Sequence, residues 1–340
     1  MLENALLEYL KSLNKEKINL NSQYYWIANI ESDGFVIKAH PVREEYQKSK
    51  KTISSVINFD IVRREISRLL KTGTLKRAEI EDQEKSRFIL ALLSCLPFVE
   101  VITTKQQTSL QIIEYKTNQL PEMNFNGTLK FLEEIQAGTH DPKRLPDIPE
   151  EAQRRSKSRA RQGLRILGFL DDEFSIIEPQ ASKYELEKNK ITFLQEMVLT
   201  SPYISMVYDL LQYLTSYTKK QKINYLKELG MKIVRNSKGD NLMVESVADY
   251  RTRNIISWLQ DVQLIDEELN PTMTEEIRPL LQKVMDNYIS AKRESTKDHK
   301  MGMLVRTELV EAFKQLEFLD NKYYEIKGSV GIGNWASVLG

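Results

Sequence analysis

Arginine and lysine side chains recur at short intervals along one predicted helix near the middle of the chain. The segment EEAQRRSKSRARQGLRILG begins at residue 150, and no acidic residue occurs between Gln153 and Leu170. Guanidinium and ammonium groups spaced in this way bind phosphates and the base edges that line the major groove of DNA. The predicted DNA-binding residues of this helix are Arg154, Arg155, Lys157, Arg159, Arg161 and Arg165.

A second segment repeats the pattern of the first. SRARQGLRILGFLDDEFSIIEP at 158–179 resembles YRTRNIISWLQDVQLIDEELNPT at 250–272, with Arg159 aligned to Arg251 and Arg161 to Arg253. This separation of 92 residues is too long for a solenoid repeat and predicts two tandem small domains. The predicted DNA-binding residues of the second copy are Arg251, Arg253 and Asn254.

The order of elements in each copy is helix, helix, basic helix and a small β-segment. This order is typical of a winged-helix domain, in which one face of the basic helix packs on its own domain and the other enters the groove. Two other interpretations stay open at this point. The cations could belong to a solvated helix face, and winged helices also form transcription regulators and protein-interaction adaptors.

A different kind of chemistry is suggested by an acidic residue on one strand and a Glu-x-Lys triplet on the next. Two carboxylates in this arrangement can hold Mg²⁺ while the lysine sits beside the attacked phosphate. Such a nuclease centre would consist of Glu100, Glu114 and Lys116. Alternating surface charges on a half-exposed hairpin explain the same residues more simply, so the sequence leaves open whether the chain is an enzyme.

Two stretches resemble known families. The Arg-led helix running into LRILGFLD, repeated in tandem, is similar to the winged-helix recognition domains of bacterial type II restriction endonucleases, especially type IIS-like enzymes. Near the end of the chain, GSVGIGNWA at 328–336 resembles the start of the N-terminal domain of McrB-type restriction proteins. Both resemblances imply DNA recognition in a restriction or antiviral defence system.

The elements that must position these residues are mostly helical. Apolar spacing predicts helices over Leu2–Leu13, Val56–Lys71, Glu79–Cys95, Ile191–Thr200 and Ile204–Tyr217. Alternating apolar runs predict hairpins at 24–40 and 98–116. The predicted fold class is mainly α with small β-hairpins, that is α+β, with tandem winged-helix domains.

The predicted organisation has four parts. These are an N-terminal α+β domain at 1–120, winged-helix domains at 121–190 and 191–300, and a C-terminal helix with a Gly-rich tail at 301–340.

Composition narrows the class of protein. The 49 basic and 48 acidic residues leave a formal net charge of +1, which conceals the local basic helix. One cysteine and three histidines argue against a disulfide framework or a metal site. We therefore expect a cytoplasmic protein that has no membrane span and binds double-stranded DNA, with a nuclease domain or subunit as a further partner. We expect no cofactor, apart from Mg²⁺ in the nuclease alternative.

Overall fold

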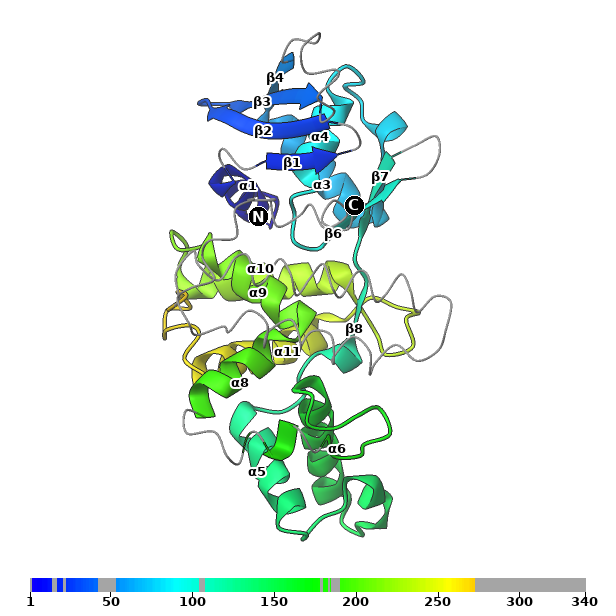
Figure 1. Ribbon diagram of the computed structural model, residues 1–340. Helices are drawn as coiled ribbons and strands as arrows, with labels where there is room; N and C mark the ends of the chain where they lie inside the picture. Colours follow the sequence, from blue (N-terminus) through cyan, green and yellow to red (C-terminus); the bar gives the residue numbers. More distant parts are fainter. Residues whose placement is uncertain are drawn as a thin grey trace. The chain divides into compact units, whose positions relative to one another are not determined.

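The computed structural model describes residues 2–13, 17–20, 23–41, 53–103, 108–177, 180–182, 184 and 190–272. These residues belong to two units (Figure 1). Of the described residues, the first unit contains those up to Glu114 together with 213–216, and the second contains those of 115–212 and 217–272. Small antiparallel sheets and numerous helices make the fold α+β, as the sequence predicts.

The first unit contains a four-stranded antiparallel sheet whose strands follow one another in chain order. The predicted hairpin at 24–40 is confirmed, and it is extended by one strand on each side. Its apolar side chains alternate in the manner of a half-buried sheet, so that Ile27, Phe35 and Ile37 are buried. The strands are β1 (Lys17–Leu20), β2 (Gln23–Ile30), β3 (Gly34–Pro41) and β4 (Ile53–Asn58).

Three helices accompany this sheet: α1 (Leu2–Ser12), α3 (Phe59–Thr72) and α4 (Ser86–Leu93). The helix predicted from Val56 begins three residues later, because 53–58 pairs with β3 and the Asn58 side chain then accepts the Asp60 N–H. It ends at Gly73, whose φ of 76° is the left-handed geometry that glycine adopts readily.

A second small sheet completes the first unit. Its strands are β5 (Thr74–Lys76), β6 (Val99–Thr103) and β7 (Thr108–Ile112), in the spatial order β5-β7-β6. The predicted second hairpin is β6 and β7. The predicted helix at 79–95 is shorter in the structure, because residues 77–79 form a 3₁₀ turn that precedes α4.

The second unit is mainly helical. Helices α5 and α6 pack against each other, as do α10 and α11, and α11 also contacts α5 and α8 (Figure 1). A short parallel pair joins β8 (Tyr115–Lys116) to β9 (Val234–Arg235). The helices are α5 (Phe125–Gln136), α6 (Glu151–Ile166), α8 (Lys190–Leu199), α9 (Pro202–Gln212), α10 (Lys219–Ile233) and α11 (Glu245–Asp261).

Among the described helices, none combines the length and the apolar character that crossing a membrane requires.

Candidate nucleic-acid interface

The internal repeat is a structural repeat, and its hydrogen bonds define its register. After α6, the carbonyl of Leu164 accepts the N–H groups of Phe169 at 2.9 Å and Leu170 at 3.4 Å. After α11, the carbonyl of Leu259 accepts those of Leu264 at 2.8 Å and Ile265 at 3.4 Å. Each helix is therefore closed by the same reversal of the chain, 95 residues apart.

The turns that follow also correspond. The Asp171 side chain accepts the Ser175 N–H at 2.7 Å, and the Asp266 side chain accepts the Asn270 N–H at 2.7 Å. Both turns contain a non-glycine residue with positive φ, Phe174 at 60° in the first copy and Leu269 at 61° in the second. This agreement extends the repeat through the turn.

The structural register corrects the alignment made from sequence. Counting 95 residues places Arg251 opposite Ser156 and Arg253 opposite Ser158, instead of opposite Arg159 and Arg161. The sequence alignment was displaced by three residues, nearly one helical turn. Such a displacement largely preserves the apolar pattern of a helix, so periodicity alone did not detect it. The arginines that the sequence alignment paired, Arg159 with Arg251 and Arg161 with Arg253, therefore lie nearly one turn apart in the two helices.

The first two turns of α6 are exposed on most of their circumference. Farther along the helix, Ala160 and Leu164 are buried against the rest of the unit. The N-terminal half is thus exposed except at Arg154 and Lys157, whose side chains contact the same unit, and we call its exposed residues the projecting half. The exposed residues of this projecting half are Glu151, Ala152, Gln153, Arg155, Ser156, Ser158 and Arg159.

Two of the predicted cations belong to the projecting half. The Arg155 side chain is 70% exposed and forms an ion pair with Glu151 one turn earlier. The Arg159 side chain is 50% exposed, and its Nε lies 4.0 Å from a carboxylate oxygen of Glu122. Exposed ion pairs are weak, so both guanidinium groups can exchange these partners for a phosphate.

The other four predicted cations of α6 contact their own unit. Lys157 forms an ion pair with Glu134, and Arg154 donates to the Ile148 carbonyl at 3.4 Å. Arg161 and Arg165 belong to the C-terminal half of α6, where the helix is packed.

Arg161 and Arg165 hold loops against α6. The Arg161 guanidinium lies 3.7 Å from the Phe174 ring centre and donates to the Pro142 carbonyl at 3.0 Å. Burial, and secondarily the positive charge of Arg165, lowers the pKa of Arg161. Arg165 donates to the Asn118 carbonyl at 3.2 Å. These contacts stabilise the fold around the helix.

In the second copy, Arg251 is buried. Its side chain is 7% exposed, forms an ion pair with Glu122 and donates to the Leu120 carbonyl at 2.7 Å. Burial lowers the pKa of Arg251, and the attraction of Glu122 partly counteracts this effect. Asn254 donates to the Pro121 carbonyl at 3.4 Å, whereas Arg253 is 72% exposed and pairs with Asp249 at 2.8 Å. Arg253 is thus the most accessible of the three predicted residues.

Residues 117–123, which we call the shared segment, receive donors from both repeat helices. From α6, Gln162 donates to the Leu120 carbonyl at 3.1 Å. From α11, the Trp258 indole donates to the Met123 carbonyl at 2.8 Å. The polar faces of the two helices therefore converge on one stretch of backbone. The sequence carries no periodic signal for these contacts, because their partners are more than 40 residues apart.

The predicted nuclease residues belong to β6, to the chain after β7 and to β8. Glu100, on β6, is 8% exposed and lies opposite Gln111 of β7. Glu114 follows two residues after the end of β7 at Ile112 and lies outside the strands. Glu114 belongs to the first unit and Lys116 to the second. Within the described residues, no three His, Cys, Asp or Glu side chains form a group that could hold a metal ion. The nuclease centre stays a prediction.

Two exposed cations near α6 were missed in the sequence. Lys143 and Arg144 lie in the 3₁₀ segment Pro142–Asp147, and the carbonyl of Pro142 is bound by Arg161. The Arg144 side chain pairs with Asp141 at 3.5 Å. The sequence signal for these two cations is the Lys-Arg pair that follows Pro142. This pair lies outside the basic helix, so the helical pattern of cations does not include it.

Comparison with known proteins identifies one segment of the chain. Residues 283–338 match the family model described as MrcB-like, N-terminal domain. No curated protein and no solved structure matches the chain. The match includes the motif at 328–336 and begins well before it, and it lies outside the described residues. The resemblance to McrB-type proteins is thereby confirmed for this segment: residues 283–338 are similar to MrcB-like N-terminal domains.

Proposed function

We propose that the chain binds double-stranded DNA in a sequence-specific manner as part of a restriction or antiviral defence system. One observation carries this proposal: the N-terminal half of α6 presents an exposed face on which the Arg155 and Arg159 side chains are accessible. A helix presented in this way fits the width of the major groove. Recognition helices contact base edges mainly through their N-terminal residues.

The polar side chains of the projecting half suit this role. Gln153 offers the amide that pairs with adenine, and arginine can pair bidentately with guanine. Ser156 and Ser158 can bond to phosphates or bases. Glu151 fits less well, because a carboxylate is repelled by phosphates; when Arg155 turns to the DNA, Glu151 can accept from the amino group of cytosine.

We assign the remaining predicted DNA-binding residues to two roles. Arg253 extends the contact surface from the second copy. Arg154, Lys157, Arg161, Arg165, Arg251 and Asn254 act mainly by holding the helices and loops in place, and those with exposed donors add phosphate contacts.

The finer parts of the proposal concern domains and partners. We interpret 121–190 and 191–300 as tandem winged-helix domains. The order of elements in the first copy supports this interpretation: helix α5, a short 3₁₀ helix, the basic helix α6 and a turn closed by the antiparallel bridge between Leu170 and Ile176. The MrcB-like match at 283–338 supports the assignment to restriction or defence. A nuclease domain or subunit would act with this chain, and the cytoplasm is the expected location.

The double variant Arg155→Ala/Arg159→Ala tests the proposal. Titration of the full chain with duplexes, after selection of bound fragments from random DNA, gives the affinity at several salt concentrations. We expect each lost base contact to cost about 1–3 kcal/mol. If both groups bind phosphates instead, the slope of log affinity against log salt falls by about 0.9 for each.

Lys232→Ala is the matched control, because Lys232 is an exposed cation of α10 on the same unit. The control should bind like the unaltered chain. Equal affinity and equal salt slope for the double variant would contradict the role of α6. A selection that enriches no DNA sequence would instead favour the adaptor function.

A further inference from the structure

A groove in the first unit lies beside the C-terminal half of α3. It has a volume of about 650 Å³, within the range of pockets that take small ligands. Its walls come from one face of α3, from β5 and from the 3₁₀ turn that follows. The residues that line it are Arg64, Ser67, Arg68, Lys71, Thr72, Thr74 and Glu79.

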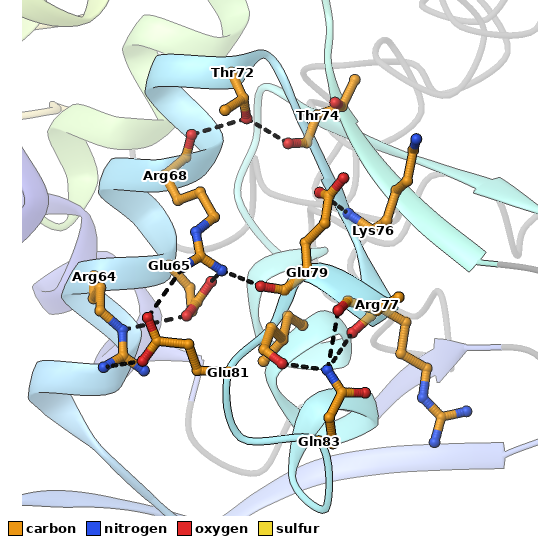
Figure 2. A network of polar contacts seen from close by, with 12 residues as sticks. Arg64, Glu65, Arg68, Thr72, Thr74, Lys76, Arg77, Glu79, Glu81 and Gln83 are labelled. Carbon is orange, nitrogen blue, oxygen red and sulfur yellow. Dashed lines mark hydrogen bonds and ion pairs between the residues drawn. The ribbon is translucent and has the colours of Figure 1, made fainter.

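Two carboxylates hold the guanidinium groups of Arg64 and Arg68 in place (Figure 2). Glu65 is buried, and its oxygens lie 3.4 Å from Arg64 Nε and 3.2 Å from Arg68 Nη1. Glu81 contacts Arg64 Nη1 at 2.9 Å and Arg68 Nη2 at 3.3 Å. Arg68 also donates to the Glu79 carbonyl. Because both guanidiniums are fixed, a ligand would order little more of them on binding.

The fixed guanidiniums retain free donors. A guanidinium has five N–H groups, and these contacts engage a part of those that each arginine carries. Among the described residues, no acceptor engages the Lys71 ammonium or the Lys76 ammonium. The groove therefore offers donors from two arginines and one lysine on its wall, with a second lysine nearby.

The acidic groups of this region are largely occupied. Glu65 and Glu81 are engaged by the arginines, and one oxygen of Glu79 accepts the Lys76 N–H at 2.9 Å. Residues 64–81 contain five cations and three carboxylates. An excess of positive charge therefore remains, and it favours an anion over a cation or a neutral ligand.

We propose that this α3 groove binds a phosphate group, presented by the backbone of a nucleic acid. Arginines in a fixed position accept the paired oxygens of a phosphate, and a lysine adds a mobile charge. The groove belongs to the first unit and α6 to the second. Phosphate binding in the groove therefore does not require that α6 recognise a DNA sequence. A free nucleotide or inorganic phosphate carries the same chemistry, so the experiment must separate these sources.

Lysine footprinting of the unaltered full chain is the first measurement. The chain is acetylated alone, with duplex DNA, with adenosine monophosphate or with inorganic phosphate, and modification of Lys71 is quantified by mass spectrometry. We expect duplex DNA to protect Lys71 severalfold, with Lys232 as the internal control. Protection by the nucleotide or by phosphate but not by duplex DNA would overturn the backbone as the source.

Lys71→Glu in the full chain is the second measurement. The Lys71 side chain is exposed and forms no hydrogen bond or ion pair with the described residues, so the fold should survive the change. We expect weaker duplex binding, and a log–log salt slope reduced by about 0.9 if one phosphate contact is lost. Lys232→Glu reverses an equal charge elsewhere and should change binding less. No protection, together with equal binding by both variants, would overturn the proposal and leave the network as a clamp on the fold.

Discussion

At the scale of single residues, burial separates arginines that the sequence treats alike. Arg251 and Arg253 lie two positions apart on α11, yet the first is buried against Glu122 and the second is exposed. The sequence could not distinguish them, because Glu122 precedes Arg251 by 129 positions. Predicting the role of a cation therefore requires its partner as well as its position on a helix.

This contrast yields a prediction for stability. Arg251→Met removes an ion pair with Glu122 and a hydrogen bond to the Leu120 carbonyl. We expect the free energy of unfolding of the second unit to fall by about 1–3 kcal/mol, the usual cost of leaving buried groups unpaired. Because Glu122 is partly exposed, water limits the loss.

Chemical denaturation followed by circular dichroism measures the change. Arg253→Met is the matched control, since its exposed pair with Asp249 should contribute no more than about 0.5 kcal/mol. Similar losses for both variants would mean that the buried pair does not stabilise the unit.

At the scale of elements, the packing of α5 on α6 depends on a glycine. A Cβ atom added to Gly163 would lie 2.6 Å from Thr128 Oγ1 and 2.7 Å from Thr128 Cγ2. Glycine in a helix costs about 1 kcal/mol relative to alanine, so close approach of the two helices is the physical reason for its presence. This close approach is part of the packing of α6 on α5.

Gly163→Ala should therefore destabilise the second unit despite the better helix propensity of alanine. We expect a net loss of about 1–3 kcal/mol from overpacking. Thr128→Ala removes both clashing atoms, so the double variant should recover most of the loss. Thermal unfolding of the single and double variants tests this coupling, and additive losses would show that the two residues do not compete for the same space.

The sequence predicted which helices and hairpins occur better than it predicted where they begin and how the two copies align. Periodicity located α1, α3, α6 and the two hairpins, because burial of one face leaves a regular pattern. It placed the start of α3 too early, since Val56 and Ile57 are apolar in a strand as well as in a helix. It also misaligned the two copies by three residues, and only the hydrogen bonds after each helix fix their register.

At the scale of the whole molecule, two separate basic surfaces are proposed to bind nucleic acid. The projecting half of α6 was found from the sequence, although most of the cations predicted with it proved to contact their own unit. The sequence does not mark the α3 groove as one site, because its residues come from a helix, a strand and a 3₁₀ turn.

The two surfaces should contribute independently to binding. Arg155→Ala/Arg159→Ala combined with Lys71→Glu is expected to lose an amount of binding free energy equal to the sum of the separate losses. Mutations at sites without shared contacts usually add within about 0.5 kcal/mol. Titration of one duplex with four proteins, namely the unaltered chain, the two separate variants and the combined variant, measures this sum. A combined loss no larger than that of the α6 variant alone would indicate that the groove does not contact the same duplex.

The convergence of both repeat helices on residues 117–123 has a mechanical consequence. Gln162 of α6 and Arg251 of α11 donate to the same carbonyl, that of Leu120. A force on α6 is therefore shared with the second copy through this carbonyl. The copy in which Arg251 is buried thus supports the copy in which Arg155 and Arg159 are exposed. Duplication of a small structural unit can in this way provide both an exposed helix and the support that holds it in place.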